Sequence, residues 1–143
     1  MPTKHIAPYI TEREYMCDCC GGYPVDFDKD NPLVIYELLF SAFKNIRETW
    51  GKAIKITSGY RCEACNSLVG GSDMSAHMFG CALDLDLDDV DEVYELDNII
   101  EELHPELRRG TYTRTGSFIH IDNAYLIHPR GSSHWREGAR WER

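Results

Sequence analysis

The 143-residue sequence lacks three features that would each indicate a particular class of protein. It has no apolar run near the ~20 residues that a membrane-spanning helix needs. Its first residues, Met1 to His5, do not show the charged, apolar and small-residue segments of a secretory signal. Basic side chains are few, with 15 lysines and arginines against 24 acidic residues and a net charge of −9. We therefore expect no membrane span and no nucleic-acid partner, since binding to phosphates requires a basic surface.

The composition is that of an ordinary globular protein, with 43% hydrophobic and 11% aromatic residues. There are no repeats or low-complexity stretches, and the length suits one domain over residues 1–143. We expect residues 1–30 to form an irregular N-terminal arm and residues 126–143 a C-terminal tail. Residues 108–143 carry seven arginines and three acidic residues. This basic region is either a solvated surface or a contact with an anionic polymer such as a bacterial cell wall.

Hydrophobic periodicity predicts an α+β fold. Apolar residues at helical spacing predict a helix from Asn31-Pro32 to Gly51, a short helix over 63–69 and an acidic helix over 90–103. Alternating patterns predict strands over 54–58, 81–88, 110–114 and 118–122. The expected architecture is a small antiparallel sheet flanked by helices.

Two segments carry side chains that are suited to metal binding. Asp84 lies on the polar face of the strand over 81–88, and His77 lies in the glycine-containing loop before that strand. In the strand over 118–122, His120 and Asp122 share one face while the isoleucines between them face the core. If the two strands are neighbours, His77, Asp84 and His120 converge, and two imidazoles with one carboxylate are typical ligands of a catalytic zinc. A single histidine, however, is more often a structural residue than a ligand.

Five of the six cysteines fall in two short segments, and without a signal peptide a reducing compartment is the default expectation. One interpretation is a structural zinc held by four thiolates, from Cys17, Cys20, Cys62 and Cys65. The alternative is a set of free or partly paired thiols that lie near one another. Cys81 stands apart in a strand-like run, and we expect it to be a small buried hydrophobic residue.

Three ordered motifs resemble those of peptidase family M15, the zinc D-Ala-D-Ala carboxypeptidases. Ser75 to Asp84 is similar to the family's Ser-x-His-x-x-Gly-x-Ala-x-Asp signature at every fixed position. Upstream, Thr57 to Arg61 and the following Asn66 and Val69-Gly70-Gly71 resemble its Ser-Gly-Tyr-Arg…Asn…Val-Gly-Gly stretch. Downstream, Phe118 to Asp122 resembles its Phe-x-His-x-Asp segment. The resemblance covers about residues 10–125 and implies a fold like that of the D,D-peptidases and the hedgehog signalling domain.

The resemblance also implies roles for individual residues. It makes His77, Asp84 and His120 the ligands of one catalytic Zn²⁺. Arg61 matches the family arginine that steadies the developing oxyanion or the substrate carboxylate. Ser75 matches the motif serine, which either hydrogen-bonds the substrate or orients its own loop.

The general base departs from the family pattern. Several members place a glutamate or aspartate three residues before the last histidine ligand, where this sequence has Ser117. Asp122 is the nearest replacement. It is therefore either the base or a partner that orients a ligand imidazole, and the sequence leaves both roles open.

These features predict a zinc peptidase that hydrolyses peptidoglycan peptides containing D-amino acids, as a D-Ala-D-Ala carboxypeptidase or a murein endopeptidase of the endolysin type. The alternative is a non-catalytic zinc-binding module of the same fold that binds the cell wall or a partner. We expect a monomer with one catalytic zinc and, if the cysteines bind metal, a second structural zinc. It would be made in the cytoplasm and act at the cell wall if it derives from a phage or prophage. The scissile bond is left open.

Overall fold

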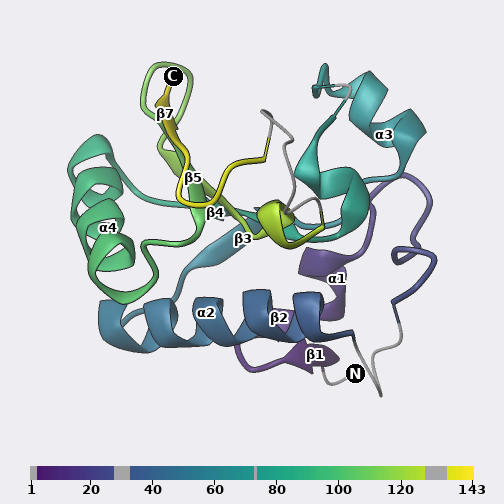
Figure 1. The fold of residues 1–143 in the computed structure, drawn as a ribbon, viewed down its shortest axis with the longest axis horizontal. Coiled ribbons are helices and arrows are strands. Elements are labelled where there is room, and N and C mark those ends of the chain that lie inside the picture. The colour runs from purple at the N-terminus through teal and green to yellow at the C-terminus, as the bar shows by residue number, and fades with distance from the viewer. Residues whose placement is uncertain (1–2, 28–32, 73, 128–134) are drawn as a thin grey trace.

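The computed structural model describes residues 3–27, 33–72, 74–127 and 135–143 (Figure 1). The helices in these ranges are α1 (Glu12–Tyr15), α2 (Val34–Trp50), α3 (Glu63–Leu68) and α4 (Val90–Leu103), with the short 3-10 turns η1 (Ala76–Phe79) and η2 (Ala124–Leu126). The strands are β1 (His5–Ala7), β2 (Ile10–Thr11), β3 (Lys55–Ser58), β4 (Ala82–Asp86), β5 (Arg108–Tyr112), β6 (Phe118–Asp122) and β7 (Arg140–Glu142).

The main sheet has five strands in the order β3-β4-β6-β5-β7. The first four pair antiparallel, and β7 pairs parallel to β5. The α+β class is confirmed, but the expected antiparallel sheet is wrong, because the sheet is mixed. The segment that we expected to be a tail supplies β7. Its three residues are too few to show an alternating pattern, so the sequence did not indicate this strand.

The expected irregular arm is also corrected by the structure. Residues 5–11 form the antiparallel pair β1-β2, and α1 follows directly. The Thr11 side chain accepts a hydrogen bond from the Glu14 backbone N–H while the Glu14 carboxylate accepts one from the Thr11 N–H, which is the capping box that begins α1. Tyr15 is fully buried and its hydroxyl donates to the Gly80 carbonyl at 2.6 Å. Residues 1–2 and 28–30 of the expected arm lie outside the described residues.

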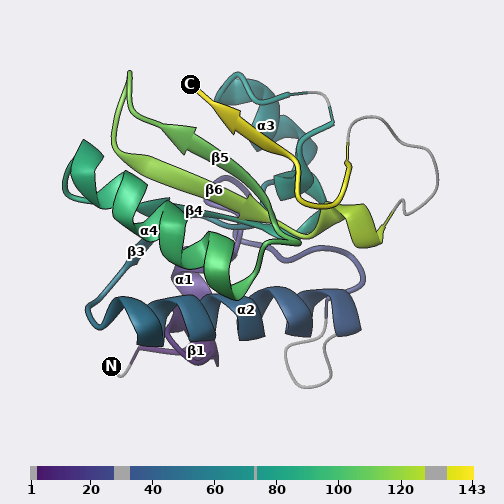
Figure 2. The same cartoon turned by 60° about the vertical axis from the view of Figure 1, so that its left-hand side comes forward.

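The two long helices cover one face of the main sheet, and α3 lies on the other side (Figure 2). The predicted bounds of α4 are confirmed, and α2 ends at Gly51, where φ is 82°. The predicted start of that helix at Asn31-Pro32 lies outside the described residues. No helix in the part of the chain that the structure describes has the length and apolar character to cross a membrane.

The strands of the sheet separate an apolar core from a polar face. Buried residues of α2 and α4 pack against the inward side chains of β4 and β6, which are Leu83, Leu85, Ile119 and Ile121. Because side chains alternate along a strand, Asp84 and His120 lie on the opposite face. The register of β4 and β6 pairs these two residues directly, so the fold brings the predicted ligands together.

Candidate metal centre

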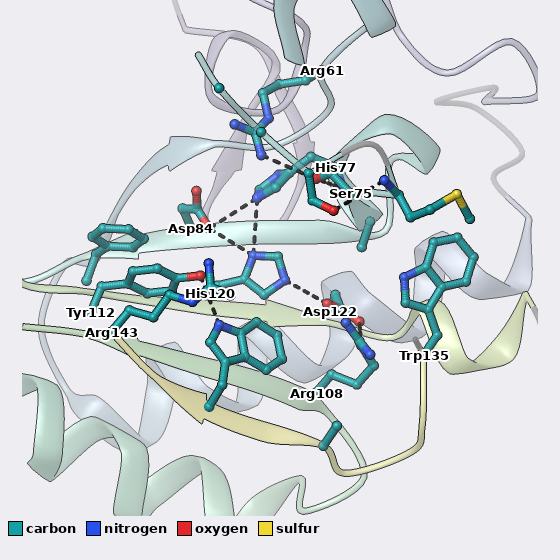
Figure 3. A pocket seen from close by; sticks show the side chains of 18 of the residues that line it. Arg61, Ser75, His77, Asp84, Arg108, Tyr112, His120, Asp122, Trp135 and Arg143 are labelled. Carbon is teal, nitrogen blue, oxygen red and sulfur yellow. Dashed lines mark hydrogen bonds and ion pairs between the residues drawn. The ribbon is translucent and has the colours of Figure 1, made fainter. Parts of the chain in front are cut away.

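Three predicted ligands meet on the polar face of the sheet (Figure 3). Asp84 comes from β4, His120 from β6 and His77 from η1. The Asp84 Oδ1 atom lies 3.1 Å from His77 Nε2 and 3.1 Å from His120 Nδ1, and the two nitrogens lie 3.2 Å apart. Both histidines are at least nine-tenths buried. The structure therefore places three ligand atoms at the corners of a nearly equilateral triangle.

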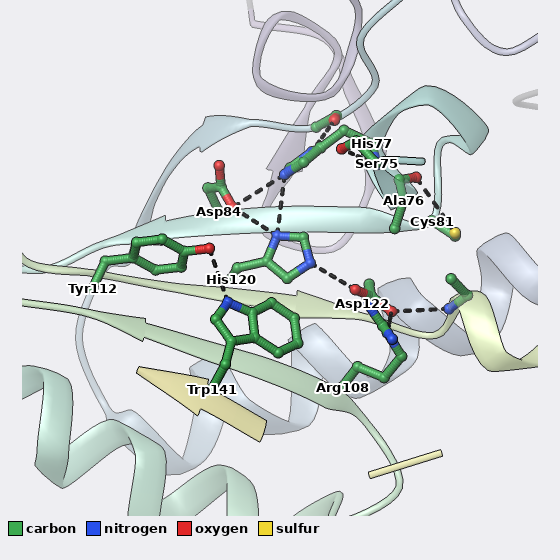
Figure 4. A network of polar contacts seen from close by, with 12 residues as sticks. Ser75, Ala76, His77, Cys81, Asp84, Arg108, Tyr112, His120, Asp122 and Trp141 are labelled. Carbon is green, nitrogen blue, oxygen red and sulfur yellow. Dashed lines mark hydrogen bonds and ion pairs between the residues drawn. The ribbon is translucent and has the colours of Figure 1, made fainter. Parts of the chain in front are cut away.

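Each imidazole is oriented by a hydrogen bond at the ring nitrogen that faces away from Asp84 (Figure 4). His77 Nδ1 lies 2.6 Å from the Gly59 carbonyl oxygen, and His120 Nε2 lies 2.6 Å from Asp122 Oδ2. Both of these oxygens only accept hydrogen bonds, so both nitrogens carry the proton. In the neutral rings, the two nitrogens that face Asp84 then present lone pairs. Three acceptor atoms converge, and such a cluster requires a positive charge among them.

The triangle has the size and chemistry of a zinc site. Zinc binds imidazole nitrogen and carboxylate oxygen at ~2.0–2.2 Å, so tetrahedral ligands are ~3.3 Å apart. The three measured separations are close to this value. Catalytic zinc sites keep a further position open for water or substrate. The three residues also line a cavity, so His77, Asp84 and His120 fit a metal ion that a substrate can reach.

The electrostatics of the three groups differ. Burial lowers the pKa of His77, and the nearby Asp84 only partly opposes this effect. Burial would also lower the pKa of His120, but hydrogen bonds and charge from Asp122 and Asp84 raise it to about 9. Burial would raise the pKa of Asp84, yet the two imidazoles hold it well below its usual range. Without a metal, a proton on His120 supplies the positive charge that the cluster requires.

Asp122 faces the back of His120. Its side chain is fully buried, and its Oδ1 accepts hydrogen bonds from the Arg108 Nε at 2.9 Å and the Ala124 backbone N–H at 3.1 Å. Its other oxygen accepts from His120 Nε2. Both oxygens are thus engaged, which favours the orienting role over the general-base role. Arg108 lies outside the strand predicted from the sequence, because β5 begins two residues before it.

Arg61 and Ser75 lie beside His77. The Ser75 hydroxyl accepts hydrogen bonds from the His77 backbone N–H at 3.2 Å and from an Arg61 guanidinium nitrogen at 3.3 Å. Ser75 therefore caps η1 and contacts Arg61 at the same time. The Arg61 Nε is buried and has no hydrogen-bond partner among the described residues. A buried donor without a partner usually indicates a missing acceptor, such as a ligand.

The cavity next to the cluster has a volume of about 490 Å³ and a cationic lining. Among the described residues, four arginines line it, and three of them come from the basic region over 108–143: Arg61, Arg108, Arg136 and Arg143. The Trp141 ring centroid lies 5.4 Å from that of His120, and the Trp141 indole N–H donates to the Tyr112 hydroxyl. Only glycine fits at position 110, because a Cβ there would lie 2.2 Å from the Trp141 Nε1.

The cysteines form a second cluster. Cys19 and Cys65 are joined by a disulfide, while the sulfurs of Cys17, Cys20 and Cys62 lie within 4.8 Å of one another. The expected fourth thiolate, Cys65, is therefore bonded to Cys19, which is the partly paired arrangement. Burial would raise the pKa of the Cys17 thiol, but backbone N–H groups of Cys62, Cys20 and Cys19 lower it to about 7. Cys81 is fully buried, as predicted.

A family model described as Peptidase M15 matches residues 9–122, a span that contains every residue of the His/Asp cluster. No curated protein matches the chain.

Proposed function

The chain belongs to peptidase family M15, and on this premise we propose that it is a zinc-dependent peptidase that cleaves peptidoglycan peptides containing D-amino acids. Family membership supports a hydrolase that acts on peptide bonds. The metal, the substrate and a fold like that of the D,D-peptidases and the hedgehog domain are parts of the proposal.

One observation carries the proposal. Two imidazole nitrogens and a carboxylate oxygen face one another at 3.1–3.2 Å on the wall of an open cavity. Metal-ligating histidines usually donate their other ring N–H to a carbonyl or a carboxylate, as His77 and His120 do here. A bound zinc ion would lower the pKa of a water molecule towards ~7 and polarise the scissile carbonyl.

The protein's own residues position the reaction. Gly59 and Asp122 fix the two imidazoles, and Arg108 holds Asp122 in place. Arg61 presents an unpaired buried N–H beside the cavity, where it would donate to an anionic group of the substrate or of the transition state. Ser75 holds both the Arg61 guanidinium and the η1 turn that carries His77.

The charge of the cavity supports a substrate that carries carboxylates. The arginines of the lining exceed its two carboxylates, Asp84 and Asp122, and both carboxylates already have partners within the protein. Stem peptides of peptidoglycan carry free carboxylates next to their D-amino acids. The aromatic residues Tyr112 and Trp141 add apolar walls that suit the side chains of a short peptide.

One observation favours the non-catalytic alternative. Asp84 and Asp122 are the only carboxylates among the described residues that line the cavity, and neither is free to act as a separate general base. Position 117 holds serine in place of a carboxylate. A zinc-binding module that binds the cell wall without cleaving it would tolerate this loss.

The experiment compares two aspartates of one strand. Asp84→Asn removes the charged ligand, whereas Asp86→Asn changes an exposed residue on the same face of β4. We expect the wild-type protein and Asp86→Asn to cleave muropeptides in a chelator-sensitive manner. Asp84→Asn should contain one zinc fewer per chain and show only background turnover. Equal zinc content in the three proteins would overturn the metal assignment, and zinc loss without any wild-type turnover would favour the binding module.

A further inference from the structure

Five cysteine sulfurs meet at one place, and none of the five residues lines the cavity. The sulfurs of Cys17, Cys20 and Cys62 lie within 4.8 Å of one another, and so do those of Cys17, Cys19 and Cys65. The two groups share Cys17, which is fully buried. The sulfurs of a tetrahedral four-thiolate zinc site lie ~3.8 Å apart, since each Zn–S bond is ~2.3 Å. Each group of three sulfurs is close to this size, and Cys65, which belongs to the second group, is bonded to Cys19 instead of facing Cys20 and Cys62.

The backbone around the cluster favours thiolates. The Cys62 backbone N–H donates to the Cys17 sulfur at 3.3 Å, and the Cys65 N–H donates to the Cys62 sulfur at 3.4 Å. Hydrogen bonds to the charged form of a group stabilise that form. Cys62 is the N-cap of α3, and its side chain accepts the hydrogen bond from the Cys65 N–H in that position. Two sulfurs are thus prepared for metal binding by the fold.

The spacing identifies four ligands among the five cysteines. Cys17 and Cys20 are three positions apart, as are Cys62 and Cys65, and two such pairs are typical of structural zinc sites. Cys19 is directly adjacent to Cys20, is exposed, and forms the disulfide with Cys65. A disulfide sulfur is not a thiolate, so Cys65 cannot ligate zinc while this bond exists.

We propose that Cys17, Cys20, Cys62 and Cys65 hold a structural zinc ion whenever the Cys19–Cys65 disulfide is reduced. A dithiol reductant transfers two electrons and two protons to the disulfide and becomes a cyclic disulfide itself. Cys19 and Cys65 are then free thiols. Zinc displaces one proton from each of the four ligand thiols, and Cys19 remains a free thiol. Of the four ligands, Cys20 is the exposed one.

The zinc would fasten the segment that supports the His/Asp cluster. Successive residues of the segment 59–62 form backbone hydrogen bonds to opposite sides. Gly59 and Arg61 bond to His77 of the His/Asp cluster. Tyr60 bonds to Tyr15, and Cys62 bonds to Cys17 of the cysteine cluster. A metal that joins Cys17 and Cys20 to Cys62 and Cys65 would clamp this segment onto the N-terminal part of the chain.

Cobalt substitution tests the proposal with the whole protein. Cobalt(II) bound to thiolates gives a sulfur-to-metal charge-transfer band in the near ultraviolet, and the His/Asp cluster has no sulfur ligand. The band therefore reports on the cysteines alone, whether or not the protein is a peptidase. We expect the band in wild-type protein that has been reduced with a dithiol, freed of it and given two equivalents of cobalt, and its absence in protein whose disulfide is intact. Two equivalents of zinc, enough for this site and for the His/Asp cluster, should abolish the band.

Matched serine variants identify the fourth ligand. Cys19→Ser prevents the disulfide, so it should bind cobalt through sulfur without any reductant. Cys65→Ser and Cys20→Ser each remove a ligand, and the intensity of the band should fall even in reduced protein; Cys20 is exposed, so its substitution leaves the core unchanged. Absence of the band from reduced wild-type protein would overturn the proposal. Loss of the band in Cys19→Ser with retention in Cys65→Ser would overturn the assigned ligand set.

Discussion

The two metal-ligating clusters are built in different ways. The His/Asp cluster takes two ligands from paired strands and one from a capped turn, and the far side of each imidazole has its own hydrogen bond. The cysteine cluster takes its sulfurs from the segment after α1 and from α3, and one of its sulfurs is committed to a disulfide. The fold therefore sets the geometry of the first cluster without a metal. The state of the second depends on its redox chemistry.

The clusters are nevertheless connected through one segment. The Gly59 carbonyl accepts from His77, and two residues further on the Arg61 N–H donates to the His77 carbonyl at 3.0 Å. The Tyr60 N–H donates to the Tyr15 carbonyl at 2.7 Å, and the Cys62 N–H donates to the Cys17 sulfur. Substitutions near a ligand of one cluster should change metal binding by that cluster alone. A substitution in the segment that both clusters share should change metal binding by both.

The largest effect is expected from Asp122→Asn, which keeps the shape of the side chain and removes its charge. The amide cannot hold His120 and Arg108 as the carboxylate does. Loss of such a partner typically weakens metal affinity ~10–100-fold. We expect zinc affinity of the His/Asp cluster to fall by this factor in competition with a chelator, and turnover to return when excess zinc is added. The sulfur–cobalt band of the reduced cysteine cluster should be unchanged.

The control for this variant is Asp97→Asn, because Asp97 forms an ion pair with Arg109, the neighbour of Arg108 on β5, at 2.9 Å. It should leave zinc affinity unchanged. If Asp122 were the general base instead, Asp122→Asn would lower turnover by ~10²–10⁴-fold while zinc stayed bound, and added zinc would restore nothing.

A second prediction concerns the pH dependence of zinc binding by the His/Asp cluster. The pKa of His120 is raised from 6.5 to about 9 in the metal-free protein, so zinc must displace a proton from this residue at neutral pH. Zinc affinity of the His/Asp cluster should rise about tenfold per pH unit between pH 7 and 9 and then level off, because one proton is released. Affinity that does not change with pH over this range would contradict the assignment of His120 as a ligand.

The raised pKa of His120 also predicts how the stability of the metal-free protein changes with pH. A raised pKa means that protonated His120 stabilises the metal-free fold fully below pH 6.5, and that this stabilisation is lost as pH rises through about 9. Chemical denaturation of metal-free protein should therefore show decreasing stability over this window. Zinc-loaded protein should lack the decrease, because the metal replaces the proton.

Sequence patterns predicted the parts of the site that depend on local order. The alternation of polar and apolar residues predicted that His120 and Asp122 share one face of a strand. The spacing of the motif over residues 75–84 predicted that His77 and Asp84 lie close to them. Arg108 was not identified as a site residue, because β5 begins two residues before the predicted strand. The three-residue strand β7, which carries Trp141, was not predicted, because it pairs with a strand far away in the sequence. The Cys19–Cys65 bond was not predicted, since spacing does not determine which cysteines pair.

The smallest effect is expected from Gly59→Ala, which acts on the shared segment. A Cβ at this position would lie 2.7 Å from the Tyr15 Cα and 2.7 Å from its carbonyl oxygen. Both are backbone atoms, so the segment must move away from Tyr15. This movement would lengthen the Tyr60–Tyr15 hydrogen bond and shift the carbonyl that orients His77. Overpacking of this kind costs ~1–3 kcal/mol of the free energy of unfolding.

Gly116→Ala is the matched control for Gly59→Ala, because a Cβ at Gly116 meets only the Phe118 ring at 3.6 Å, an ordinary contact. Denaturant titration should show lower stability for Gly59→Ala alone. Because one segment supports both clusters, the same variant should also weaken zinc binding by the His/Asp cluster and cobalt binding by the reduced cysteines. If only one affinity changed, the clusters would be independent, and the backbone contacts of residues 59–62 would not couple them. Parallel losses in both affinities would instead show that this segment supports both clusters.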